Sequence, residues 1–278
     1  MMRGMFAAIS GLKVHQMMLD VTANDIANVN TIGYKSERTS FKDALSQLQR
    51  GSSAPSATLG GTNSAQVGLG VQLNGIDNLM QSGAIQSTGN ALDCAIQGDG
   101  FFRITDDPSS FGNILYTRAG NFSRDANGDL VTPEGYYVVG YTIDATTGQP
   151  TTTETTINIP ANTKSVTIGQ DGIVTTIDSS GTVTAVAAIT MANFPNAQGL
   201  ERVSGNKFGA SNNSGSEVAG TAGTNGLGTI TPGSVEMSNV DLAQEFTNMI
   251  TAQRGFQANS RIISTADEML QELVNLKH

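Results

Sequence analysis

Residues 2–26 read MRGMFAAISGLKVHQMMLDVTANDI, and apolar side chains recur along this stretch at alternating spacings of three and four residues. Such alternation is typical of the face by which one helix packs along another. One polar residue, Gln16, interrupts the face. We therefore predict a long N-terminal helix over residues 1–30. The residues predicted to form its packing face are Met2, Met5, Ile9, Leu12, Leu19 and Ile26.

A second helical pattern occupies the other end of the chain, residues 236–278. The apolar residues that repeat there every seven positions, together with one further aromatic residue, are Leu242, Phe246, Met249, Phe256, Ile263 and Leu270. Ser238 or Asn239 is expected to cap this helix, because either side chain can accept hydrogen bonds from the first turn. Two interpretations are open. The helices lie on one globular domain as amphipathic helices, or they pair with each other and with further copies as a coiled coil.

The middle of the chain has a different pattern. Residues 51–66 are rich in Gly, Ser, Ala and Thr, so we predict an extended linker region over residues 31–75. Across residues 76–235, short β-branched or aromatic runs alternate with turn signals, a pattern typical of a β-sandwich or barrel. The predicted fold class is therefore α+β, mostly β, with a β-rich body inserted between long N- and C-terminal helices.

Charge and hydropathy restrict the possible partners. The 278 residues include 15 Lys and Arg against 24 Asp and Glu, a net charge of −9. Nonspecific nucleic-acid binding needs a dense basic face, so we expect no nucleic-acid partner. A membrane-spanning helix needs about 18 or more consecutive apolar residues, and we expect none. A cleavable signal peptide is not expected either, because Ser10, Gly11 and Lys13 interrupt the apolar start.

Residue types that carry chemistry are scarce. The sequence has one cysteine, Cys94, which we expect to be a small buried side chain, and two histidines, His15 and His278, which we expect at the surface. A serine nucleophile would need a histidine in the β-rich body, where neither lies. We therefore predict no catalytic residue, no cofactor and no enzymatic activity.

The strongest candidate for a metal site is the stretch from Asp125 to Asp129, DANGD, whose alternating oxygen ligands are similar to a calcium loop. An EF-hand loop needs glycine at its sixth position and glutamate at its twelfth. Here Gly128 is fourth and Glu134 is tenth. A hairpin turn on Asn127-Gly128 is the better interpretation, and no metal site is predicted.

Residues 19–35, LDVTANDIANVNTIGYK, resemble the N-terminal signature of bacterial flagellar axial proteins, the rod and hook family. The similarity continues in order through residues 67–71, 86–93, 98–102, 116–122, 238–242 and 253–260. Within the family, residues 254–259 and 267–276 are most similar to hook proteins, and the distal rod protein is the alternative. The residues that carry the signature are Asn24, Asn28, Asn30, Thr31, Gly33, Tyr34 and Lys35.

This resemblance implies a structural subunit of the bacterial flagellar hook that self-assembles into a helical tube. The tube would transmit torque from rod to filament and enclose the export channel. The resemblance also selects between the two interpretations of the helices: the long N- and C-terminal helices would pair as a coiled coil and form an inner core domain, with their two apolar faces packed against each other. Residues 76–235 would form an outer domain. The implied partners are further copies of the chain, rod proteins, hook–filament junction proteins and the hook cap.

The resemblance further implies a location outside the cell in the flagellum, or in the basal body for a rod protein. Because a lone helix of about 25 residues is marginal in water, we expect both ends to be disordered in the free subunit and to fold on assembly. Two alternatives from other classes are a secreted β-rich adhesin or binding module and a β-fold hydrolase.

Overall fold

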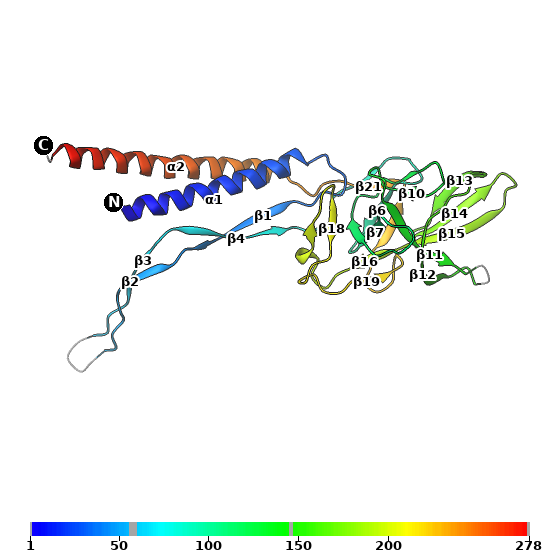
Figure 1. Cartoon of the computed structure of the whole chain (residues 1–278), viewed down its shortest axis with the longest axis horizontal. Helices are drawn as coiled ribbons and strands as arrows, with labels where there is room; N and C mark the ends of the chain where they lie inside the picture. Colours follow the sequence, from blue (N-terminus) through cyan, green and yellow to red (C-terminus); the bar gives the residue numbers. More distant parts are fainter. Residues whose placement is uncertain (1, 56–59, 145–146, 277–278) are drawn as a thin grey trace. The chain divides into compact units, whose positions relative to one another are not determined.

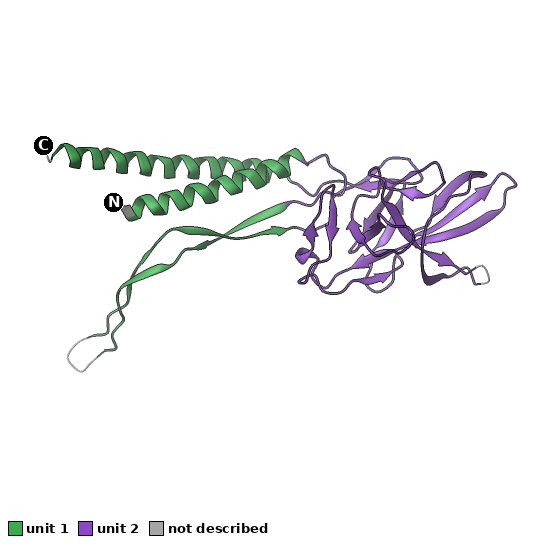
Figure 2. Cartoon of the chain, in the orientation of Figure 1, with its two compact units in different colours: residues 1–27, 37–78, 241–278 green, residues 28–36, 79–240 purple. Residues whose placement is uncertain are grey.

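The computed structural model describes residues 2–55, 60–144 and 147–276, which form two compact units (Figure 1, Figure 2). Unit 1 combines residues 1–27, 37–78 and 241–278, and unit 2 combines residues 28–36 and 79–240. The chain therefore passes from one unit to the other four times. A β-rich body is inserted in the sequence between two long helices, which confirms the predicted fold class.

Unit 1 contains the two long helices, α1 (Met2–Ala27) and α2 (Leu242–Asn275), which run antiparallel (Figure 1). Asp241 caps α2, accepting hydrogen bonds from the backbone nitrogens of Ala243 at 2.9 Å and Gln244 at 3.3 Å. The prediction that Ser238 or Asn239 would be the cap is wrong. The reason is that the Asn239 side chain is engaged by backbone groups of unit 2 instead.

The rest of unit 1 is a two-stranded ribbon. Strand β1 (Glu37–Asp43) pairs antiparallel with β4 (Val71–Asn78), and β2 (Ser46–Arg50) pairs antiparallel with β3 (Ala65–Gly68). We predicted an extended linker here, and the difference arises because each strand satisfies its backbone groups on the other. The ribbon lies against α1: the Val71 amide donates to Ser10 Oγ at 3.2 Å.

Unit 2 holds the other strands, most of them short. The first are β5 (Ile85–Ser87), β6 (Cys94–Gln97), β7 (Phe101–Thr105), β8 (Ile114–Thr117), β9 (Ser123–Arg124), β10 (Leu130–Val131) and β11 (Tyr137–Ile143). The next are β12 (Pro150–Thr156), β13 (Thr163–Ile168), β14 (Ile173–Asp178), β15 (Val183–Ile189) and β16 (Met191–Asn193). A short 3₁₀ helix (Ala197–Gly199) precedes β17 (Glu201–Arg202), β18 (Lys207–Gly209), β19 (Val218–Gly220), β20 (Thr229–Pro232) and β21 (Ser234–Glu236).

Thirteen of these strands join in one curled antiparallel sheet. Its main path runs β13-β14-β15-β11-β7-β8-β18-β17, with β9, β10, β12, β16 and β19 as branches. Strands β6 and β20 form a separate pair, as do β5 and β21. We expected a sandwich or a barrel, but the path from β13 to β17 does not return to its start.

Two apolar clusters make the core of unit 2. The larger contains Phe102, Ile104, Leu130 and Ile189, which lie on three different strands of the sheet, β7, β10 and β15. The smaller is aromatic, and its members include Phe101, Tyr116, Phe194 and Phe208. Aromatic rings in edge contact favour such packing, as where the Phe101 and Phe208 centroids lie 5.8 Å apart. The β-rich unit thus has a core of its own.

The DANGD stretch forms the turn between β9 and β10. Gly128 has a φ of 98°, and its amide donates to the Asp125 carbonyl at 3.2 Å. Oδ1 of Asp125 accepts from the amides of Asn127 at 2.9 Å and Asp129 at 2.8 Å. The hairpin turn is therefore confirmed, and this Asp125 oxygen is used by the turn itself.

Candidate assembly surfaces and the signature segment

The helices of unit 1 meet through small residues. A Cβ on Gly11 would come within 2.6 Å of Nδ2 of Asn259, and a Cβ on Gly255 would come within 2.5 Å of the His15 ring. Each glycine therefore makes room for a side chain of the other helix. Buried alanines lie on both helices, Ala8 on α1 and Ala252 and Ala266 on α2.

The large apolar residues predicted for the contact between the helices are buried to different extents. Ile9, Leu242, Phe246 and Phe256 are 37%, 40%, 50% and 38% exposed. These four side chains therefore keep much of their surface uncovered in the single chain, and their place in the contact stays a prediction. The half-buried members of the predicted set are Met5, Leu12, Leu19, Ile26, Met249, Ile263 and Leu270. Met2 is helical, and its side chain lies outside the described part.

Further large side chains extend these uncovered faces. On α1, Phe6 is 62% exposed; on α2, Ile250, Ile262, Met269 and Leu273 are also exposed. Contiguous apolar surface of this kind is typical of a site that contacts another macromolecule. The helix pair therefore has an unused apolar surface besides the surface that joins its two members.

The two histidines were predicted at the surface. His15 is instead half-buried, with its ring against Gly255 and its centroid 6.5 Å from that of Phe41 in edge contact. Its place on α1 opposite a glycine of α2 explains the burial. His278 lies outside the described residues.

The signature residues after α1 belong to unit 2. Asn28 and Thr31 close a turn, in which the Thr31 amide donates to the Asn28 carbonyl and its hydroxyl to Asn28 Oδ1, each at 3.1 Å. Gly33 has a φ of 68°, and a Cβ there would lie 2.5 Å from the Ala119 nitrogen. Glycine is required at this position on both counts.

The remaining signature residues differ in exposure. Tyr34 is buried, and the Arg202 guanidinium lies 4.8 Å from its ring centroid. Lys35 is buried as well, whereas Asn30 is exposed. Asn24 is the one signature residue on α1 in unit 1. The signature is thus mainly a segment folded into the β-rich unit rather than part of the helix.

A buried charge cluster surrounds Lys35. Its ammonium lies 2.6 Å from Oε1 of Glu236, and the Arg118 guanidinium lies 3.1 Å from Oε2 of the same carboxylate. Burial lowers the pKa of Lys35, and the nearby Glu236 carboxylate opposes that shift. The Gly83 amide also donates to Oε1 of Glu236 at 2.8 Å. The carboxylate therefore joins segments that are far apart in the sequence.

Next to this cluster, Ser36, Leu79 and Asn239, which come from three separate segments, are also hydrogen-bonded to one another. The Ser36 amide donates to Oδ1 of Asn239 at 2.7 Å, and the Leu79 amide donates to the Ser36 carbonyl at 2.8 Å. Nδ2 of Asn239 donates to the Leu79 carbonyl at 2.8 Å and to the Gln81 carbonyl at 3.2 Å. Sequence reasoning missed Glu236 and this use of Asn239, because their partners are set by tertiary contacts.

A second charge cluster ties branches of the sheet together. Arg103 on β7 lies 2.6 Å from Glu154 on β12 and 3.2 Å from Glu217, which precedes β19. The Tyr116 hydroxyl donates to Glu217 at 2.7 Å. Burial and then this carboxylate raise the pKa of Tyr116. Cys94 is fully buried as predicted, and burial raises the pKa of its thiol to about 12.

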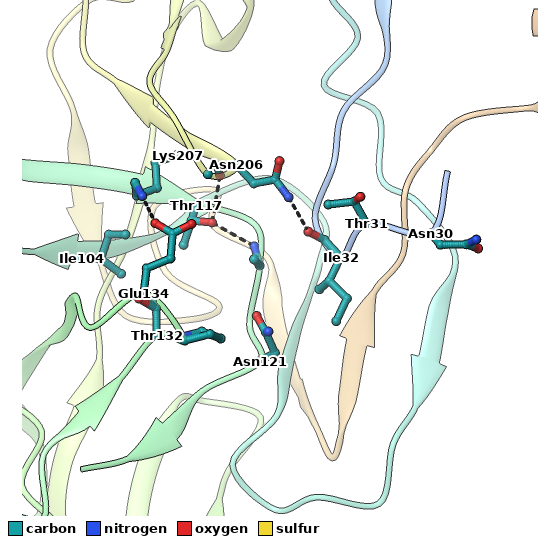
Figure 3. A pocket seen from close by; sticks show the side chains of 13 residues that line it. Asn30, Thr31, Ile32, Ile104, Thr117, Asn121, Thr132, Glu134, Asn206 and Lys207 are labelled. Atoms are coloured by element: carbon teal, nitrogen blue, oxygen red, sulfur yellow. Dashed lines mark hydrogen bonds and ion pairs between the residues drawn. The ribbon is translucent and has the colours of Figure 1, made fainter. Parts of the chain in front are cut away.

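A pocket of about 280 Å³, lined by both polar and apolar residues, lies in unit 2 and includes part of the signature segment (Figure 3). Lys207 is ion-paired with Glu134 in its wall, and Nδ2 of Asn206 donates to the Ile32 carbonyl at 3.0 Å (Figure 3). The charges in the wall thus balance within the chain. Asp129, at the end of the DANGD stretch, accepts a hydrogen bond from Nδ2 of Asn158 at 2.9 Å.

The described part of the chain offers neither a metal cluster nor a membrane-spanning helix. Within residues 2–55, 60–144 and 147–276, His, Cys, Asp and Glu do not cluster in the threes or more that a metal ion would need. Neither described helix combines the length and the apolar character required to cross a membrane. The strongest chemical features of the described residues are therefore the uncovered apolar surface of the helices and the buried charge clusters of unit 2.

Exposed apolar side chains along paired helices, attached in sequence to a β-rich unit, are typical of a structural subunit that associates with further copies. Three family profiles match the chain. They are described as "Flagella basal body rod protein" at residues 5–35, "Flagellar hook protein FlgE/F/G D1 domain" at residues 95–176 and "Flagellar basal body rod FlgEFG protein C-terminal" at residues 231–276.

Relatives match over the whole length. The flagellar basal-body rod protein FlgG of Bacillus subtilis is 48% identical over 278 residues, covering 100% of both chains. The FlgG of Agrobacterium fabrum is 38% identical over 96% of this chain and 97% of its own. The flagellar hook protein FlgE of Borreliella burgdorferi is 28% identical over 446 aligned positions, with 100% of both chains covered.

Among solved structures, the Helicobacter pylori flagellar hook protein FlgE2 aligns with 61% of this chain and 46% of its own, at 15% identity and a TM-score of 0.22. The full-length identities decide the family: the chain belongs to the flagellar rod and hook proteins, the structural family of the bacterial flagellum. The resemblance seen in the signature is thereby confirmed.

Proposed function

We propose that this chain is the distal rod subunit of the flagellar basal body. The observation that carries the proposal is the 48% identity with a rod protein across the full length of both chains, against 28% with a hook protein. The hook alignment extends over 446 positions, so that hook protein has long insertions relative to this chain of 278 residues. The rod alternative therefore replaces the hook as the favoured function.

Self-assembly would use the uncovered faces of the helices. Large side chains such as Phe6, Phe246 and Phe256 are partly exposed on the described chain, and covering each with a further copy contributes about half of the roughly 1.5–3 kcal/mol of a fully exposed side chain. Contacts between unlike surfaces of identical subunits that do not close into a ring produce a helical tube. The predicted assembly residues on α1 and α2 would then pack between subunits. Other rod proteins and the hook would be the partners at the two ends of the tube.

Electron microscopy of basal bodies from a deletion strain tests the proposal. We expect basal bodies that lack the distal part of the rod, and restoration of that part when the gene is returned. A complete rod without a hook would overturn the rod assignment in favour of the hook. Normal flagella in the deletion strain would overturn both. Family membership leaves the adhesin and hydrolase interpretations without support.

A further inference from the structure

The segments by which the chain leaves and enters unit 2 are bonded to one another inside that unit. The chain leaves unit 2 after Ser36, re-enters at Leu79 and leaves again after Val240. Ser36, Leu79 and Asn239 form a closed set of hydrogen bonds, with donor–acceptor distances of 2.7 to 2.8 Å. Three of the four crossing points therefore meet within unit 2.

The buried charge cluster adds ties next to this set. Lys35 precedes Ser36, and its ammonium contacts both Glu236 at 2.6 Å and the Gln81 carbonyl at 2.7 Å. The Gly33 amide donates to the Glu236 carbonyl at 2.8 Å. The same three segments, 33–36, 79–83 and 236–239, are thus joined by side chains as well as by backbone groups.

Lys35 is not needed to neutralise the cluster. Arg118 also pairs with Glu236, so removing Lys35 still leaves one buried cation beside one buried anion. Burying an additional ammonium is unfavourable unless it makes good contacts. The Lys35 ammonium contacts both Glu236 and the Gln81 carbonyl, so it links two segments of the chain. We infer that this link, rather than charge neutralisation, is its role.

We propose that Asn239, Lys35 and Glu236 form a junction clamp, which holds the chain crossings of unit 2 as one rigid group so that a twisting load is shared among them. In a rod subunit, load that passes along the chain from one unit to the other crosses these covalent connections. A connection that is not bonded to the others would bend independently under load. Connections that are hydrogen-bonded to one another resist bending and twisting together. The clamp deepens the proposed rod function and rests on it, and its three members are positioning residues.

Hydrogen–deuterium exchange on the full-length subunit tests the clamp itself. In Asn239→Ala, the amides of Ser36 and Leu79 should exchange at least tenfold faster, while those of the central strand β7 stay unchanged. Lys35→Met should have the same local effect through different bonds. Asn158→Ala is the matched control, because that amide also bridges two segments of unit 2, donating to Asn127 and Asp129.

Each exchange outcome decides the matter. Unchanged exchange at Ser36 and Leu79 would overturn the clamp. Faster exchange throughout unit 2, including β7, would show a general loss of stability. The Asn239→Asp variant keeps the acceptor for the Ser36 amide, and if it also exchanges faster throughout unit 2, the clamp is likewise overturned.

Rotation under load tests the mechanical role. In the bacterium that encodes this chain, we expect Asn239→Ala subunits to build rods that electron microscopy finds complete in dilute medium. In viscous medium the fraction of cells that keep their flagella should fall at least twofold relative to Asn158→Ala. Equal retention would overturn the mechanical role, as would an absence of rods from exported Asn239→Ala subunits. If the wild-type chain is not found in rods at all, the proposed function fails, whereas the exchange result still decides whether the clamp exists.

Discussion

At the scale of single residues, Glu236 faces two buried cations, Lys35 and Arg118. Glu236→Gln would leave both cations without a buried anion, and breaking a buried ion pair from one side costs roughly 3–5 kcal/mol. Lys35→Met leaves Arg118 paired, so its cost should be less than half of that. Urea unfolding of the full-length subunit, read at a signal of the β-rich unit, measures both. Equal costs for the two variants would contradict this charge balance.

Gly33 shows how much of this region was open to prediction. The signature of residues 19–35 pointed to an important segment, and its glycine proves to combine a positive φ with a close approach to Ala119. Glu236 lies 201 positions from Lys35 in the sequence, and a hydrogen bond at that separation has no local signal. The signature motif therefore predicted the importance of Lys35 but not of its partner Glu236.

At the scale of the elements, the helix contact depends on Gly255 facing His15. Gly255→Leu would drive a side chain into the imidazole ring, and overpacking of this kind costs about 1–3 kcal/mol. We expect assembled polymers of this variant to melt at a lower temperature. His15→Ala removes the obstructing ring, so it should restore part of the loss in the double variant.

The melting temperature of sedimentable polymers measures both effects. His15→Ala combined with Phe246→Ser is the matched control, because Phe246 is half exposed and should lose apolar contact between subunits instead. We expect no rescue there. Strictly additive effects of Gly255→Leu and His15→Ala would contradict the close contact between the helices.

The helices also show why periodicity alone was insufficient. The spacing of apolar residues correctly predicted two long helices, since α1 and α2 occupy the residues of the two patterns. Spacing alone left the pairing of the helices open, and the family resemblance implied it. The spacing also gave no sign that Gly11, Gly255 and buried alanines would lie between the helices, because a heptad pattern marks the large apolar side chains. The ribbon over residues 37–78 was missed because its pairing depends on both strands together.

At the scale of the whole molecule, unit 1 and unit 2 bury very different sets of side chains. Unit 2 has a core of fully buried Phe, Ile, Leu and Val residues, whereas the buried apolar residues of the helix pair are chiefly alanines. Apolar area removed from water contributes roughly 25 cal/mol per Å², so a contact made of small residues stabilises the pair little by itself. Further copies would supply the missing area at the exposed phenylalanines.

We therefore expect the terminal helices to be weakly ordered in the free subunit and firmly ordered in the polymer. Far-ultraviolet circular dichroism and limited proteolysis should show residues 1–30 and 240–278 cut first in dilute subunit, and protected once polymers form. A chain lacking both ends should keep its β signal and fail to polymerise. Full protection of α1 and α2 at concentrations where no polymer sediments would contradict this, because the contact between the two helices would then suffice to hold them.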